Sequence, residues 1–196
     1  FTVDEFDRFM EKVPERVLII LDEAYFEYAD SLDDYPDSMH YRYDNVITLR
    51  TFSKAHGLAG FRVGYGFAHE DLIENLNKVK LPFEPSWPAQ VAATAALDDS
   101  AHIENTIASC REGMENMEMV FKELELDYIP SSANFLTLVF ENEEEAASFC
   151  DTMLHKGIIL RHLAGWGLPD CVRITIGQES ENEYLVSCLS EILSEA

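Results

Sequence analysis

Five residues in the first third of the chain have side chains that could do chemistry. They are Asp22, Tyr25, Ser53 and Lys54, which follow short apolar runs, and Arg62, eight residues beyond Lys54. The first two follow the apolar run at 17–21, and the next two follow the run at 45–50. Ligands of open α/β sheets bind beyond the carboxyl ends of the strands. If the two runs form neighbouring strands, we expect these side chains to meet in one crevice.

The charges of these side chains suggest which ligand they would bind. Lys54 and Arg62 suit an anion, and the hydroxyl of Ser53 is a further donor for a phosphate. Asp22 suits a cationic group at the far end of the ligand. Lys54 has no acidic neighbour in the local sequence "TFSKAHGLAG", which suits covalent bonding to an aldehyde. Pyridoxal phosphate combines a phosphate, a pyridinium nitrogen and an aldehyde, so it is the cofactor that this set predicts.

The helices and strands expected around these residues indicate an α/β fold. The run at 17–21 is continuously apolar, which is typical of a strand buried on both faces, as in a parallel sheet. Further strands are predicted at 45–50 and 62–68. Helices are predicted at 2–13, with Thr2 and Glu5 in capping-box spacing, at 70–80 and at 89–99. Residues 29–44 are polar and acidic and predict a surface excursion.

The second half of the chain predicts a smaller α+β unit. A long helix is expected over 100–125, where apolar residues recur every three or four positions. Strands are predicted at 133–140, 158–163 and 171–177, and helices at 143–157, closed by Gly157, and at 179–193. The sequence therefore predicts two domains, 1–99 and 100–196.

Composition narrows the class of protein. The 196 residues include 37 acidic and 14 basic side chains, a net charge of −23, which repels nucleic acid. No apolar run approaches the roughly 20 residues of a membrane helix, and residues 1–10 are acidic and unlike a signal peptide. Four dispersed cysteines without a CxxC pair indicate reduced thiols and a cytoplasmic protein. No histidine spacing indicates a metal site.

Three motifs carry a family resemblance. "LDEAYFEY" and "TLRTFSKAHGLAGFRVGYG" resemble the fold-type I pyridoxal-phosphate aminotransferases, and "IILRHLAGWGLPDCVRITIG" resembles the C-terminal substrate motif of one group among them. That group is the histidinol-phosphate aminotransferases. The resemblance runs in order over nearly the whole chain.

The resemblance implies a role for each matching residue. Lys54 would form the Schiff base with the cofactor, Asp22 would pair with the pyridine nitrogen and Tyr25 with the ring hydroxyl. Ser53 and Arg62 would hold the phosphate. Arg173 and Arg161 would bind the anionic group of the substrate. The implied reaction is transamination of histidinol phosphate with 2-oxoglutarate, in histidine biosynthesis, by a homodimer.

The sequence also departs from the family pattern. The N-terminal arm, a glycine/aromatic phosphate loop and an Asn-Pro-x-Gly segment are not found in these 196 residues. The chain also begins without Met. We therefore expect it to be the C-terminal portion of the enzyme, comprising the later part of the cofactor-binding large domain and the small domain, and inactive by itself if the rest is required.

Other interpretations stay open at this point. An aromatic-amino-acid aminotransferase or a threonine-phosphate decarboxylase of the same fold would share Asp22, Lys54 and Arg62. A non-catalytic fragment would also fit. Asp22 commonly caps a turn when it follows a strand, and a strand arginine such as Arg173 commonly faces solvent. His56 and His162 adjoin the motifs, but neither spacing nor resemblance assigns them a catalytic role.

Overall fold

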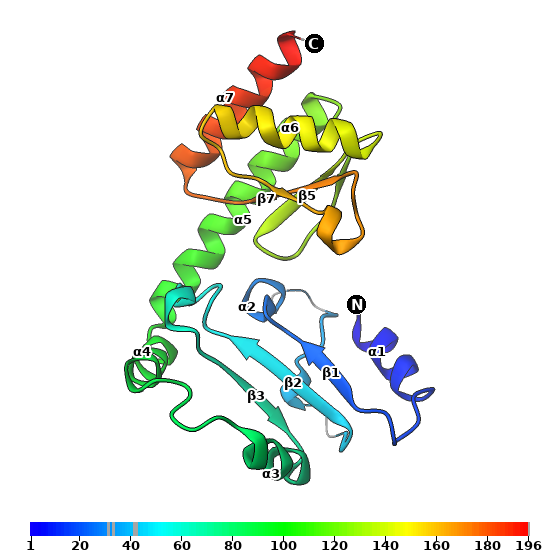
Figure 1. The fold of residues 1–196 in the computed structure, drawn as a ribbon, viewed down its shortest axis with the longest axis vertical. Coiled ribbons are helices and arrows are strands. Elements are labelled where there is room, and N and C mark those ends of the chain that lie inside the picture. The colour runs from blue at the N-terminus through cyan, green and yellow to red at the C-terminus, as the bar shows by residue number, and fades with distance from the viewer. Residues whose placement is uncertain (31, 33, 41–42, 196) are drawn as a thin grey trace. The chain divides into compact units, whose positions relative to one another are not determined.

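The computed structural model describes residues 1–30, 32, 34–40 and 43–195. They form two compact units, Phe1–Asn105 and Thr106–Ala196 (Figure 1). The division falls inside the long helix α5, Ser100–Glu123, a few residues after the predicted boundary at 99. The assignment of the two units to a cofactor domain and a small domain stays a prediction.

Unit 1 is built on a three-stranded sheet in the order β1-β2-β3. β1 (Ile19–Asp22) runs parallel to β2 (Val46–Thr51), and β3 (Gly64–Ala68) runs antiparallel to β2. The three predicted strands are confirmed. The sheet of this unit has one parallel pair and one antiparallel pair, so it is not mostly parallel as the sequence predicts.

Helix α1 (Val3–Met10) covers one face of β1. The predicted capping box is present, since Thr2 Oγ1 accepts from the Glu5 N–H at 3.2 Å and Glu5 Oε2 accepts from the Thr2 N–H at 2.9 Å. The helix ends at Met10, earlier than predicted, and buries Phe6 and Met10 against the sheet.

The prediction that the first strand is buried on both faces is wrong. Leu21 is buried beneath α1, but Ile20, which points the other way, is 64% exposed. β1 is an edge strand, and within the described residues its second face has no cover.

Three helices complete unit 1: α2 (Phe26–Ala29), α3 (Glu70–Val79) and α4 (Trp87–Leu97). α4 is rich in alanine and approaches closely, so that Ala89 and Ala93 are buried with Phe52 and Val63. Phe52 lies between the end of β2 and Lys54. This small cluster therefore anchors the turn that carries the lysine.

The predicted surface excursion at 29–44 is only partly described, because residues 31, 33, 41 and 42 lie outside the described residues. Its described part includes the short 3₁₀ helix Ser38–His40 and the buried Pro36. The Asp37 side chain reaches inward to Arg50. This part of the segment is therefore more than a solvated loop.

Unit 2 is a four-stranded antiparallel sheet in the order β4-β5-β7-β6. The strands are β4 (Tyr128–Ile129), β5 (Phe135–Val139), β6 (Arg161–His162) and β7 (Cys171–Thr175). The predicted strands are confirmed, β6 in shortened form, whereas β4 is not predicted by the sequence.

Helices α5, α6 (Glu143–His155) and α7 (Glu179–Glu195) share one hydrophobic core with this sheet (Figure 1). The most deeply buried members are Met117, Phe121, Leu136, Met153, Ile174 and Leu189. Leu136 and Ile174 are register partners, so the helices pack on the sheet face that these two residues share. α6 is followed by Gly157 at φ +85°, which confirms the predicted glycine cap.

Candidate functional site

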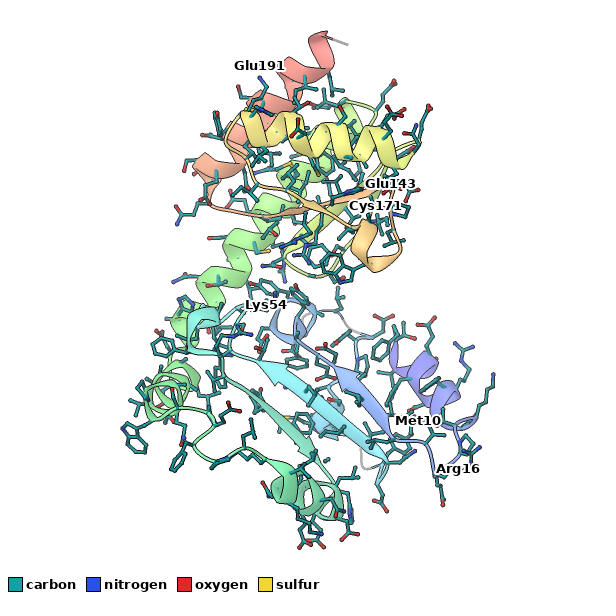
Figure 2. All side chains as sticks on the ribbon, in the orientation of Figure 1. Met10, Arg16, Lys54, Glu143, Cys171 and Glu191 are labelled. Atoms are coloured by element: carbon teal, nitrogen blue, oxygen red, sulfur yellow. The ribbon has the colours of Figure 1, made fainter. Side chains whose placement is uncertain are left out.

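Two strand ends meet at one edge of the sheet in unit 1. Because β1 and β2 are parallel neighbours, their carboxyl ends lie at the same edge, and Asp22 is the register partner of Leu49. The chain leaves this edge through Thr51 to Ser53 and Lys54. Figure 2 shows Lys54 beyond the end of β2. The two strand ends that carry these polar side chains therefore lie side by side, as the sequence predicts.

Lys54 and Tyr25 lie in contact at this edge. The Lys54 Nζ is 5.0 Å from the centroid of the Tyr25 ring, a cation–π distance. The Lys54 turn is closed by a 2.9 Å hydrogen bond from the Gly57 N–H to the Lys54 carbonyl. Gly57 has φ +70°, a conformation that favours glycine. Backbone hydrogen bonding therefore fixes the position of the turn from which the Lys54 side chain extends.

Asp22 and Ser53 flank this contact. The exposed Asp22 carboxylate accepts from the Ala24 N–H through Oδ1 at 3.0 Å, which is the turn-capping role common after a strand. Its Oδ2 accepts no hydrogen bond from the described residues. The Ser53 N–H donates to Thr51 Oγ1 at 3.1 Å. Capping therefore leaves one Asp22 oxygen available to a ligand.

Arg62 reaches the same edge from β3. It lies two residues before Gly64, whose register partner is Thr51 at the end of β2. Its backbone is left-handed (φ 54°, ψ 52°), which costs a non-glycine residue roughly 1–3 kcal/mol and often marks a functional position. Its guanidinium donates to the Ala59 carbonyl at 2.8 Å.

In the part of the chain that the structure describes, neither cation at this edge is neutralised by a neighbouring acid. Among the described residues, no carboxylate lies within ion-pair distance of Lys54 or Arg62. In a chain with a net charge of −23, two cations at one sheet edge that have no acidic partner among the described residues fit an anionic ligand.

A buried ionic cluster behind this edge was not predicted. Arg50 donates to Glu23 and to Asp37, each at 2.8 Å, and its guanidinium carbon lies 3.3 Å from the centroid of the Phe26 ring. Burial alone would lower the pKa of Arg50, but the hydrogen bonds to Glu23 and Asp37 outweigh it and raise that pKa. Burial opposes the charged form of Asp37 as well, yet the Met39 N–H and Arg50 lower its pKa.

This cluster ties β2 to the segment that follows β1. Arg50 precedes the Lys54 turn, and Glu23 and Phe26 flank Tyr25. The sequence offers one signal for it, an acid and an arginine at the ends of neighbouring strands. The third member, Asp37, comes from the predicted surface excursion and has no local signal.

The two arginines predicted to bind substrate belong to unit 2. Arg161 and Arg173 are register partners on β6 and β7, so their side chains leave the same face of the sheet, opposite the helices. The Arg173 guanidinium carbon lies 4.9 Å from the Phe135 ring centroid, and its buried Nε donates to none of the described residues. The Arg161 guanidinium carbon lies 5.7 Å from the Trp166 ring. Two stacked, opposed arginines with an unused donor suit an anion.

The two histidines left unassigned by the sequence have different surroundings. His162 Nε2 lies 2.6 Å from the Pro169 carbonyl and bonds the turn between β6 and β7. His56 Nε2 lies 3.5 Å from Glu27 Oε1, and both side chains are nearly buried.

Two further kinds of feature concern the described ranges, a membrane-spanning helix and a metal site. No helix there is both long and apolar enough to cross a membrane. The same ranges hold no cluster of three or more His, Cys, Asp or Glu side chains arranged for a metal ion.

Comparison with known sequences decides the family. A profile described as "Aminotransferase class I and II" matches residues 1–189. The chain belongs to this aminotransferase family. It is 42% identical over 194 residues to histidinol-phosphate aminotransferase 1 of Nitrosococcus oceani, covering 98% of this chain and 52% of that protein. It is 44% identical over 191 residues to the histidinol-phosphate aminotransferase of Akkermansia muciniphila, covering 96% and 51%.

Solved structures of this aminotransferase family share the fold. The chain superposes with a TM-score of 0.90 on the histidinol-phosphate aminotransferase of Sinorhizobium meliloti, solved in complex with pyridoxal-5'-phosphate, at 28% identity. The match covers 100% of this chain and 54% of that one. The fold-type I aminotransferase fold predicted from the sequence is therefore confirmed. The chain spans about half the length of the curated relatives it matches, and its assignment to the C-terminal portion stays a prediction.

Proposed function

We propose that this chain serves pyridoxal-phosphate-dependent transamination of histidinol phosphate with 2-oxoglutarate, a reaction of histidine biosynthesis. The observation that carries the proposal is Lys54, which has no acidic partner among the described residues and lies over the Tyr25 ring where two parallel strands end. The names of the relatives support the substrate.

The residues at the sheet edge fit the cofactor. The Lys54 amine is the group that would bond to its aldehyde carbon. The remaining Asp22 oxygen would accept from the ring nitrogen, and the Tyr25 hydroxyl would donate to the ring oxygen. Ser53 and Arg62 would hold the phosphate, which agrees with the left-handed conformation of Arg62 and with its lack of an acidic partner among the described residues. When bound, the cofactor supplies an electron sink for the substrate carbon.

Each side chain then has a defined task. The Asp22 carboxylate would keep the proton on the ring nitrogen through a charge-assisted hydrogen bond. The Lys54 Nζ would be the base that moves the proton of the reacting substrate carbon. The contact with the Tyr25 ring would keep the Lys54 amine close to the cofactor site.

The paired arginines of unit 2 would bind the substrates. Histidinol phosphate carries a phosphate, and glutamate and 2-oxoglutarate carry carboxylates. All three present an anion, so Arg161 and Arg173 would accept either substrate of a transaminase at one place. The buried Nε of Arg173, which has no partner among the described residues, is the donor that such an anion would use.

We also propose that the chain self-associates, as a homodimer in the complete enzyme. Four large apolar side chains near the start of α4 are 64–96% exposed. They are Val79 (75%), Leu81 (64%), Phe83 (96%) and Trp87 (75%). Apolar surface of this kind marks interaction sites. Light scattering combined with gel filtration tests this, and a monomer at all concentrations would contradict it.

Reductive trapping tests the cofactor site. The chain is incubated with pyridoxal phosphate, treated with borohydride and mapped by mass spectrometry. We expect the adduct on Lys54, and none on the exposed Lys78 and Lys80 at low reagent concentration. Lys54→Arg keeps the charge and should lose the adduct. Labelling scattered over surface lysines would refute the assignment for this chain and would favour a non-catalytic fragment.

A substrate panel separates the proposed reaction from its relatives. In the complete enzyme, amino transfer should be fastest with histidinol phosphate. Faster turnover of phenylalanine would indicate an aromatic-amino-acid aminotransferase, and release of carbon dioxide from threonine phosphate would indicate a decarboxylase. Arg173→Gln should raise the KM for histidinol phosphate, while Arg8→Gln, on the exposed side of α1, should not.

A further inference from the structure

A nearly buried histidine–glutamate pair lies beside the Lys54–Tyr25 contact and has no part in the roles described above. His56 Nε2 lies 3.5 Å from Glu27 Oε1, and the two side chains are 8% and 12% exposed. His56 follows Lys54 by two residues, and Glu27 follows Tyr25 by two residues. The pair therefore joins the two segments that carry the contact.

Among the described residues, the pair makes no further side-chain hydrogen bonds through its two remaining polar atoms. The remaining polar atoms, His56 Nδ1 and Glu27 Oε2, are buried and have no hydrogen-bond partner among the described residues. A buried carboxylate or imidazole without a partner is unfavourable, so each side chain depends on the other. Their mutual attraction is thus specific to one arrangement of the two segments.

Packing keeps the imidazole in this place. The His56 ring lies 4.8 Å from the ring of Phe52, which is buried in the cluster beneath α4. Glu27 belongs to α2, for which Tyr25 is the N-cap residue. One partner is therefore anchored to the Lys54 turn and the other to the helix that begins at Tyr25.

We propose that His56 and Glu27 are positioning residues that hold the Lys54 turn against the start of α2 and so set the distance between the Lys54 amine and the Tyr25 ring. The pair touches neither substrate nor cofactor in this role. The importance of this distance for catalysis rests on the proposed function. The contact between Lys54 and Tyr25 can nevertheless be measured without cofactor.

The test compares variants that separate positioning from stability. His56→Phe keeps a ring against Phe52 but leaves the Glu27 carboxylate buried and alone. The double variant His56→Phe/Glu27→Leu removes both polar groups, which preserves the packing without an isolated charge. Glu27→Gln keeps an acceptor for the imidazole N–H. His155→Phe is a matched control, because His155 forms an exposed pair with Asp151 at 3.6 Å.

Two measurements are made on each variant. Nuclear Overhauser contacts between the Lys54 side chain and the Tyr25 ring report the distance in the cofactor-free chain. The pyridoxal phosphate concentration that half-saturates reductive labelling of Lys54 reports its consequence. Amide exchange in β2 reports whether the unit stays folded.

In the double variant we expect the Lys54–Tyr25 contacts to disappear and the half-saturating concentration to rise about tenfold or more, as for a small misplacement of a reacting group. Glu27→Gln and the control should keep the contacts, and amide exchange in β2 should be unchanged in the double variant. Unchanged contacts in the double variant would overturn the proposal, as would a loss that accompanies faster exchange throughout β2. If Lys54 of the unmodified chain takes no label while the contacts respond as expected, the positioning role stands and the cofactor assignment fails.

Discussion

Replacing Arg50 with Met should destabilise unit 1 by roughly 3–5 kcal/mol, because it leaves a buried carboxylate without its partner. Glu23 is fully buried and receives both a 2.8 Å ion pair and a 2.8 Å Nε hydrogen bond from Arg50. Its second oxygen, Oε1, already has no partner among the described residues. No other charge described in unit 1 is then available to Glu23 at hydrogen-bond distance.

Most of the stability lost in Arg50→Met comes from leaving the Glu23 carboxylate buried without its partner. The loss of the Arg50 contact with the Phe26 ring, at 3.3 Å, adds on the order of 0.5–2 kcal/mol. Asp37 is 30% exposed and can return to water, so the loss of its ion pair contributes about 0–1 kcal/mol. Contributions within one cluster are not additive, so these values are not summed, and the expected loss of stability is the one that Glu23 sets.

Amide hydrogen exchange at residues 47–50 of β2 is the appropriate assay, because it reports the opening of this sheet separately from that of unit 2. The double variant Arg50→Met/Glu23→Leu should recover most of the stability, since an apolar replacement of a buried pair is often neutral. Lys122→Met, which removes an exposed 3.5 Å pair with Glu118, should change nothing measurable. A loss below about 1 kcal/mol for Arg50→Met would refute the reasoning, because the cluster would then behave as a surface pair.

Three further predictions concern packing and titration. Gly64→Ala would place a Cβ 2.7 Å from the Arg50 carbonyl oxygen and should cost about 1–3 kcal/mol in urea unfolding, whereas Gly60→Ala, with nothing within 4 Å, should stay within about 0.5 kcal/mol. Burial first, and then the charge of a neighbouring carboxylate, raise the pKa of Tyr35 from 10.0 to about 12. Folding thus favours the neutral form of Tyr35. The contribution of this group to the free energy of unfolding is complete below pH 10 and is lost as the pH rises to about 12. The variant Tyr35→Phe should flatten this fall of the melting temperature with pH in thermal melts. Phe121→Ala in the core of unit 2 should cost about 3–5 kcal/mol by calorimetry, since this side chain is 0% exposed; a loss under about 1 kcal/mol would show that the site collapses freely.

Local signals in the sequence predicted most elements correctly. The Thr2–Glu5 spacing predicts the start of α1, and Gly157 predicts the end of α6, because both depend on residues within one helical turn. Apolar runs predict β1, β2 and β3 for the same reason. The neighbourhood of Asp22 and Lys54 also follows, because parallel strands bring their carboxyl ends together.

The failures lie where distant parts of the chain decide the outcome. The apolar run at 17–21 does not show that β1 is an edge strand with Ile20 exposed, because burial depends on what covers the sheet. The two-residue strand β4 is too short for a periodic pattern. Asp37 and His56 each bond to a partner more than ten residues away, and no local spacing encodes such a pair.

The opposed arginines on β6 and β7 lower the stability of the strand pair that carries them. Like charges directly opposite each other weaken a strand pair, and Arg161 and Arg173 are register partners. Replacing Arg161 with Thr should therefore make unit 2 slightly more resistant to heat while it weakens the hold on an anion. In the proposed role as an anion site, this strand pair would give up some stability in exchange for activity.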